Sequence, residues 1–159
     1  MKIFSIIIIL LVNISCNKKD EIVESVMATN YESFLYNNKS YMDSLRKVVV
    51  QEGKIEDFEN LYNICVFSVN TREEVYYTKI MAEKYNYPKA YYYLYISSRY
   101  QNSKNMDKLA VYYLLKAYEG NCEEAKYGIG EIFKNKPIPK SEDYLCIQDT
   151  TKLVEIPIM

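Results

Sequence analysis

Apolar residues recur at spacings of three and four positions from about residue 39 to residue 134, which is the period of one face of an α-helix. Gly, Asn and Pro interrupt this pattern and divide it into paired segments. The pattern predicts three helix pairs, each joined by a tight turn: 39–52 with 55–68, 71–85 with 88–100, and 106–119 with 123–134. Pro88 suits the first turn of its helix, and Gly120 with Asn121 suits a helix end that requires a left-handed residue.

Two of these pairs are copies of one unit. Residues 79–94 align with residues 114–129 at a shift of about 35 positions. The alignment pairs Ala82 with Ala117, Asn86 with Asn121, Ala90 with Ala125, and Leu94 with Ile129. A weaker copy covers residues 50–62. Small residues at the paired positions let two helices approach closely while Leu, Tyr and Phe fill the groove around them, so the sequence predicts an all-α fold of about three helix-turn-helix repeats.

The last unit, residues 106–133 (MDKLAVYYLLKAYEGNCEEAKYGIGEIF), resembles a SEL-type repeat, which is related to tetratricopeptide repeats. It has the acidic residue, the Lys-Ala step before a Gly-Asn turn, and the Ala, aromatic and Gly positions that follow, with one extra residue between Asn121 and Ala125. In the preceding unit, Tyr95 and Ser98 depart from the family's Gly and aromatic residue. The resemblance implies a short right-handed α/α solenoid that holds proteins together and does not catalyse a reaction.

The first residues form a different kind of segment. Lys2 precedes an apolar run from Ile3 to Val12, which is too short for a membrane span of about 20 residues and has the layout of a secretory signal. Residues 11–16 (LVNISC) resemble the lipobox of bacterial lipoproteins, in its looser Bacteroidota-type form. The resemblance implies that Cys16 is lipidated and anchors the chain to the bacterial outer membrane, facing the periplasm or the cell surface. The alternatives are that Cys16 is an ordinary thiol after a plain signal peptide or at the end of a buried strand.

These observations divide the chain into four parts. Residues 1–15 are the predicted signal peptide, and residues 16–38 hold the lipidated cysteine followed by either a tether or a capping helix. Residues 39–135 are the helical repeat domain, and residues 136–159 are a C-terminal tail. Pro137 and Pro139 predict an extended or turn-like start to this tail, which then either folds back to cap the last helix pair or stays disordered.

Composition narrows the function further. Lys and Arg number 20 against 21 Asp and Glu, so no basic face is dense enough to bind nucleic acid. The chain has no histidine, which is the commonest general base and metal ligand, so we expect no cofactor and no metal. Neighbouring carboxylates on a helix point in different directions and are favoured near helix starts, and this applies to the pairs Glu56/Asp57, Glu73/Glu74 and Glu123/Glu124. The sequence therefore predicts a protein that is not an enzyme, with a cell-wall-cleaving enzyme as the competing class.

Three cysteines remain once Cys16 is assigned to the lipid. Cys65, Cys122 and Cys146 are an odd number without a close pair, so the sequence signals neither a disulfide framework nor a zinc cluster. One bridge between Cys122 and Cys146 is compatible with an envelope location, and unpaired thiols are the alternative.

Tyrosine is the most abundant aromatic residue, with 18 copies. Consecutive tyrosines occur at residues 76–77, 91–93 and 112–113, so they cannot all face one core. Because tyrosine is enriched at interfaces, we expect Tyr77 and Tyr112, at matching positions of two first helices, to form part of a concave binding face. Tyr76 and Tyr113 are the alternative pair, and use of tyrosine as general core filler is the competing interpretation.

The sequence as a whole favours a lipid-anchored envelope protein that binds another protein or a peptide without catalysis. An immunity-type lipoprotein that binds and neutralises an envelope-targeted toxin is the alternative, since a small anchored repeat scaffold suits shape complementarity.

Overall fold

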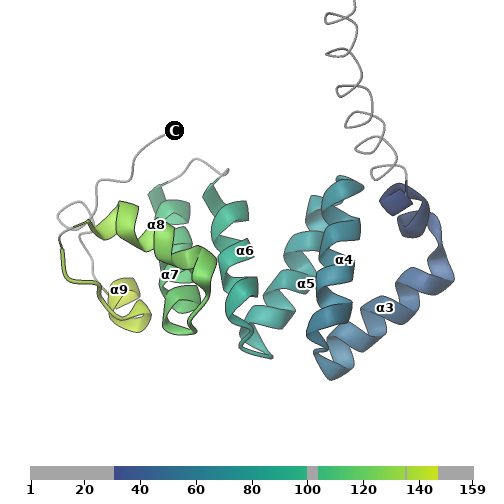
Figure 1. Ribbon diagram of the computed structural model, residues 1–159, viewed down its shortest axis with the longest axis horizontal. Helices are drawn as coiled ribbons and strands as arrows, with labels where there is room; N and C mark the ends of the chain where they lie inside the picture. Colours follow the sequence, from purple (N-terminus) through teal and green to yellow (C-terminus); the bar gives the residue numbers. More distant parts are fainter. Residues whose placement is uncertain (1–30, 100–103, 135, 147–159) are drawn as a thin grey trace, which may run out of the picture.

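The computed structural model describes residues 31–99, 104–134 and 136–146. These residues fold into helices, and this part of the chain contains no β-strand. Residues 31–37 are helical and are followed by seven helices in chain order: α3 (Lys39–Glu52), α4 (Ile55–Phe67), α5 (Thr71–Glu83), α6 (Pro88–Arg99), α7 (Lys104–Glu119), α8 (Glu123–Phe133) and α9 (Ser141–Cys146). Figure 1 shows them packed one after another along the length of the molecule.

The six helices from α3 to α8 correspond to the three predicted pairs, with ends within two residues of the predicted ones. In each pair a left-handed residue follows the first helix: Gly53 at φ 64°, Asn86 at φ 51° and Asn121 at φ 62°. Gly and Asn adopt this conformation most readily, which is why they end helices in this way. The predicted left-handed turn at Asn121 is confirmed, and the Cys122 N–H closes it by donating to the Ala117 carbonyl at 3.0 Å.

The core runs continuously between the helices. The four alanines that align between the repeats have no exposed surface, as expected where two helices approach closely, and they are Ala82, Ala90, Ala117 and Ala125. Leu94 and Ile129, which also align, are 2% and 3% exposed. Contacts join each helix to the next in the series from α3 to α8, and α9 packs on α7. The repeat alignment therefore describes equivalent core positions.

The C-terminal tail begins with an irregular stretch, as predicted, and then forms the short helix α9. Residues 137–140 are irregular, whereas α9 packs against α7. The Tyr144 ring is 1% exposed and meets Phe133 edge-on at 6.5 Å, and both the backbone N–H and the hydroxyl of Ser141 donate to the Glu119 carboxylate at 2.7 Å. Of the two alternatives for the tail, folding back is thus correct for residues 141–146, and residues 147–159 lie outside the described part.

The N-terminal end of the described chain also packs on the repeats. Within the segment expected to be either a tether or a capping helix, residues 31–37 are helical, and Leu35 and Tyr36 pack against the core. The predicted signal peptide and Cys16 lie outside the described residues. In the described part, no helix combines the length and the apolar character needed to cross a membrane.

Candidate functional site

Tyr77 and Tyr112 occupy equivalent places in α5 and α7, and both rings are partly buried against the hydrophobic core. Tyr77 meets the Tyr76 ring edge-on at 4.9 Å, and Tyr112 lies against Tyr113 at 5.6 Å. Among the described residues, no hydrogen bond or ring contact joins Tyr77 to Tyr112. The two tyrosines therefore belong to separate clusters on successive first helices.

The partly buried tyrosines of the described residues form two groups, and Tyr77 and Tyr112 belong, with Tyr62, Tyr92 and Tyr118, to the group whose hydroxyls have no hydrogen-bond partner in this part of the chain. Within the described residues, neither the Tyr77 nor the Tyr112 hydroxyl has a hydrogen-bond partner. Other tyrosine hydroxyls donate to carboxylates or backbone carbonyls of the protein, and these belong to Tyr36, Tyr85, Tyr87 and Tyr93. A ring fixed by packing, with a hydroxyl free to bond elsewhere, suits contact with a ligand.

The two tyrosines of the alternative pair, Tyr76 and Tyr113, differ strongly in exposure. Tyr76 is 57% exposed, whereas Tyr113 is only 5% exposed and packs against Tyr91. In the run of three tyrosines on α6, Tyr91 is buried while Tyr92 and Tyr93 are partly buried. The three side chains therefore do not all face one core. The two partly buried rings, Tyr92 and Tyr93, fill the grooves between neighbouring helices.

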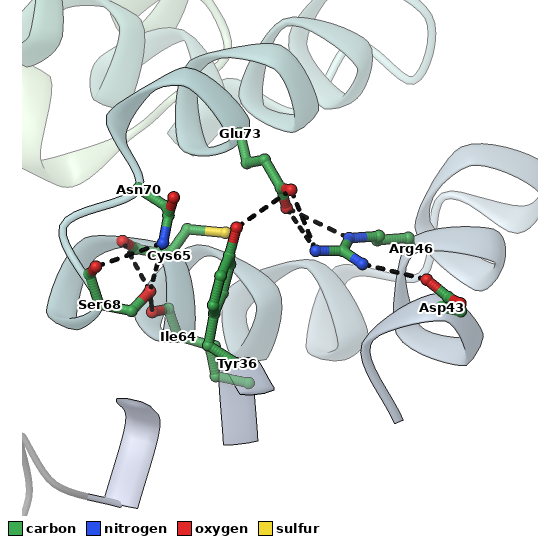
Figure 2. A network of polar contacts seen from close by, with 8 residues as sticks. All are labelled: Tyr36, Asp43, Arg46, Ile64, Cys65, Ser68, Asn70 and Glu73. Atoms are coloured by element: carbon green, nitrogen blue, oxygen red, sulfur yellow. Dashed lines mark hydrogen bonds and ion pairs between the residues drawn. The ribbon is translucent and has the colours of Figure 1, made fainter. Parts of the chain in front are cut away.

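A polar network lies beside Tyr77 and links α3, α5 and the helix at residues 31–37 (Figure 2). The Arg46 guanidinium donates to both carboxylate oxygens of Glu73, at 2.8 and 3.0 Å from Nη2 and 3.2 Å from Nε. The Tyr36 hydroxyl donates to the same carboxylate at 3.2 Å, and Arg46 Nη1 reaches Asp43 at 3.1 Å. Burial raises the pKa of Tyr77, and the charge of Arg46 opposes this shift. The network holds the surface next to Tyr77 in a fixed arrangement.

A second polar cluster is centred on Glu59 of α4. Its carboxylate accepts hydrogen bonds from the hydroxyls of Tyr93 at 2.8 Å and Tyr87 at 3.0 Å, and lies 3.4 Å from Lys89 Nζ. Tyr62 stacks on Tyr93 with ring centres 3.9 Å apart and planes at 7°. Burial, followed by the hydrogen bond to Glu59, raises the pKa of both Tyr87 and Tyr93. Sequence reasoning missed this cluster, because its members lie 28 to 34 positions from Glu59 and carry no local signal.

Two of the three neighbouring carboxylate pairs, Glu73/Glu74 and Glu123/Glu124, have separate partners. Glu73 binds Arg46, whereas Glu74 is 8% exposed and accepts from the Ser97 hydroxyl at 2.9 Å, and burial raises the pKa of Glu74. Glu123 pairs with Lys126 at 2.6 Å, whereas Glu124 accepts from the Cys122 thiol at 3.1 Å. The members of these two pairs therefore face different neighbours, as expected for adjacent residues on a helix.

The two described thiols are buried and free. Burial raises the pKa of Cys65 to about 12 and that of Cys122 to about 11, so both stay protonated near neutral pH. A protonated thiol is a poor nucleophile and a poor metal ligand. Cys122 carries no disulfide, and the side chain of Cys146 lies outside the described residues. Across the described ranges, no three His, Cys, Asp or Glu side chains come together as a metal site.

Comparison of the chain with protein-family models, with curated protein sequences and with solved structures finds no match. The similarity to SEL-type repeats and to bacterial lipoproteins therefore rests on the residues quoted above. Tyr77, Tyr112 and Cys16 remain predicted site residues.

Proposed function

We propose that this protein is a lipid-anchored module of the bacterial cell envelope that binds another protein or a peptide without catalysis. The binding face includes Tyr77 of α5 and Tyr112 of α7. The packed helix pairs are proposed to be SEL-type, tetratricopeptide-like repeats of a short right-handed α/α solenoid. Cys16 carries the lipid and tethers the repeats to the outer membrane.

One observation carries this proposal: the equivalent Tyr77 and Tyr112 rings are held against the core while their hydroxyls lack partners in the described part of the chain. A rigid aromatic side chain loses little conformational entropy on binding, and its hydroxyl adds a directional hydrogen bond. Two such residues at the same position of successive repeats would contact an extended ligand at regular intervals. The nearby Arg46–Glu73 network supports this role because it fixes the surface beside Tyr77.

The protonated thiols and the separately partnered carboxylates support the non-catalytic part of the proposal. General acid–base catalysis requires groups positioned around one reacting bond, and nucleophilic catalysis requires an activated nucleophile. The carboxylates described above are held by internal partners instead, with Glu73 on Arg46 and Glu123 on Lys126.

The test uses a photo-crosslinking amino acid placed separately at Tyr77, Tyr112 and Tyr127 of the full chain in its native cell. Tyr127 is the matched control, because it is a tyrosine on α8 that is 77% exposed. We expect the same crosslinked partner from positions 77 and 112 and none from position 127. Equal crosslinking from all three positions would contradict the proposed face.

The affinity of the recovered partner is then measured for the wild type, for Tyr77→Phe/Tyr112→Phe and for Tyr77→Ala/Tyr112→Ala. The Phe variant keeps the buried rings and removes only the hydroxyls, so it separates binding from packing. We expect the Ala variant to bind at least about tenfold more weakly, equivalent to about 1.4 kcal/mol, with the Phe variant in between. Mass spectrometry of the N-terminal peptide, compared with Cys16→Ala, tests the lipid independently.

A further inference from the structure

Five large apolar side chains are exposed on the segments around the C-terminal end of α4, and are called the α4-end patch. They are Tyr31 (60% exposed), Phe34 (66%), Val66 (41%), Phe67 (47%) and Val69 (84%). Tyr31 and Phe34 are three positions apart on one helix and so share a face. Scattered apolar residues are ordinary on a protein surface, but a group on neighbouring segments indicates a contact surface.

The two segments that form the patch are neighbours in space. Tyr36, on the same helix as Tyr31 and Phe34, lies against the end of α4 beside Ile64 and Cys65 (Figure 2). Its hydroxyl donates to Glu73, two residues into the helix that follows the α4–α5 turn. Figure 1 shows the helix at residues 31–37 beside this end of α4, while Ile55 starts α4 at the opposite end.

Val69 adds an independent observation. It adopts the left-handed conformation with φ 60°, which is unfavourable for a β-branched residue. Gly53, Asn86 and Asn121, which tolerate this conformation, follow the first helices α3, α5 and α7, whereas Val69 follows the second helix α4 and Lys134, at φ 46°, follows the second helix α8. The left-handed residue closes the end of α4, where the Asn70 N–H donates to the Cys65 carbonyl at 2.8 Å, but a β-branched residue makes this closure costly. The retention of an exposed valine in this turn is consistent with a requirement for an apolar side chain there.

The position of the patch identifies its occupant. Cys16 and Tyr31 are separated by residues 17–30, a stretch of 14 positions that spans at most about 50 Å when fully extended. The patch therefore includes Tyr31, where the proposed tether joins the described chain, and the tether keeps a bilayer at high effective concentration next to it. Tyrosine and phenylalanine favour the headgroup region of a bilayer, and Arg72, exposed in the first turn of α5, suits its phosphates.

We propose that the α4-end patch rests on the membrane surface, with Phe34, Phe67 and Val69 inserted at the headgroup–acyl boundary. This inference depends on the lipid anchor of the proposed function. The contact fixes the repeats in one orientation, so that the faces of α5 and α7 stay accessible to a partner. A lipid chain combined with a few interfacial side chains binds a bilayer more firmly than either contact alone.

The absence of tryptophan from the chain provides a clean test, because a single introduced tryptophan is a unique fluorescent reporter. Phe67→Trp reports on the patch, and Ile55→Trp is the matched control, 51% exposed and about 18 Å away at the other end of α4. Each full-length lipidated variant is reconstituted into vesicles of phosphatidylethanolamine and phosphatidylglycerol, with and without brominated acyl chains. We expect a blue-shifted emission and loss of intensity to brominated lipid for Phe67→Trp, and neither for Ile55→Trp. Adding Phe34→Ser and Val69→Ser to Phe67→Trp should reduce the quenching.

Other outcomes separate this proposal from the anchor. If the chain floats with the vesicles while Trp emission at position 67 stays unshifted and accessible to iodide, the patch proposal is overturned and the anchor stands. If that emission is already blue-shifted without vesicles, a segment of this chain or a second copy covers the patch, which also overturns it. If mass spectrometry finds Cys16 unmodified, the anchor fails, and the unmodified chain is titrated with the same vesicles. Quenching at position 67 alone would then support the patch, and its absence would refute it.

Discussion

Arg46 on α3 and Glu73 on α5 form an ion pair in which the Nη2 atom of Arg46 donates to both carboxylate oxygens of Glu73, at 2.8 and 3.0 Å. The helices involved are the first helices of successive pairs, and the contact bridges 27 positions of sequence. The pair is partly shielded from water, with 22% of the Arg46 and 33% of the Glu73 side chain exposed. Its geometry suits guanidinium and carboxylate, and an ammonium group could not reproduce it.

A double-mutant cycle of Arg46→Ala and Glu73→Ala should give a coupling free energy of about 1 kcal/mol in urea unfolding. The matched cycle uses Asp43→Ala, because Asp43 contacts the same guanidinium at 3.1 Å but is 56% exposed. That cycle should give about 0.3 kcal/mol, the usual value for an exposed helical ion pair. Equal coupling energies in the two cycles would show that burial does not distinguish the pairs.

Replacing Glu59 by Ala should lower the free energy of unfolding by about 2 kcal/mol. The reason is that the hydroxyls of Tyr87 and Tyr93 lose a shared acceptor in a partly buried place, and Lys89 loses an ion-pair partner. Glu59→Gln keeps a hydrogen-bond acceptor, so its free energy of unfolding should lie between those of the wild type and Glu59→Ala. The control is Glu56→Ala in the same helix, whose side chain is exposed, with an expected change within about 0.5 kcal/mol. Thermal and urea unfolding of all four proteins would measure the difference.

Replacing Val69 by Gly should stabilise the fold by about 1 kcal/mol, because glycine relieves the left-handed strain at φ 60°. Val66→Gly, three positions earlier and inside α4, should have the opposite sign and a similar size. The pair is compared by chemical denaturation. A destabilised Val69→Gly protein would mean that the valine side chain contributes to the fold and that its retention needs no membrane contact.

Two Gly→Ala substitutions should also have opposite effects on the free energy of unfolding. Gly53→Ala is expected to destabilise by about 2 kcal/mol, because Gly53 has φ 64° and an added Cβ would overlap the Tyr85 ring. Displacing that ring breaks the hydrogen bond from the Tyr85 hydroxyl to the Val50 carbonyl. Gly130→Ala within α8 should stabilise by about 1 kcal/mol, since nothing lies within 4 Å of the added Cβ. Circular dichroism melts of the two variants would reveal the contrast.

Stability should decline steeply in alkaline solution, starting above about pH 10. Burial raises the pKa of Tyr62 to about 12, and it raises that of several other tyrosines, namely Tyr87, Tyr91, Tyr92, Tyr93, Tyr95 and Tyr113. The folded chain then holds more protons than the unfolded chain, so this contribution is complete below pH 10 and is lost as pH rises through the folded pKa values.

Near-ultraviolet absorbance of tyrosinate and helical circular dichroism, recorded along one alkaline titration, would test this expectation. The buried tyrosines should ionise only as helicity disappears. A single tyrosinate transition near pH 10 with helicity intact would contradict the prediction.

The helix pairs could be predicted because their information is local. A period of three and four positions, together with turn residues such as Asn86 and Asn121, is visible within one or two helices of sequence. Helix α9 was not predicted, because its six residues are too few to show a period and it depends on Tyr144 packing against Phe133. The left-handed turn at Val69 could not be predicted either, because valine rarely adopts this conformation and so gives no sign of it in the sequence.

The polar clusters lie beyond sequence reasoning for a different reason. Glu59 and Glu73 resemble many other acidic residues on helices, and only the packing of helices distant in sequence brings tyrosine hydroxyls or Arg46 to them. The predicted binding residues, Tyr77 and Tyr112, could be predicted in part. Their equivalent positions follow from the repeat in the sequence. The lack of a partner for their hydroxyls is visible only in the described structure. Whether these tyrosines bind a partner stays a prediction.

Helix α9 also has a consequence for assembly. A stack of helix pairs can in principle grow without limit, because the last pair presents the same kind of surface that the next pair would cover. Here α9 lies on α7, with Tyr144 seated against Phe133 and Ser141 bonded to Glu119. A second molecule that continued the array from that surface would have to displace α9, so a contact within the chain competes with end-to-end growth into a filament.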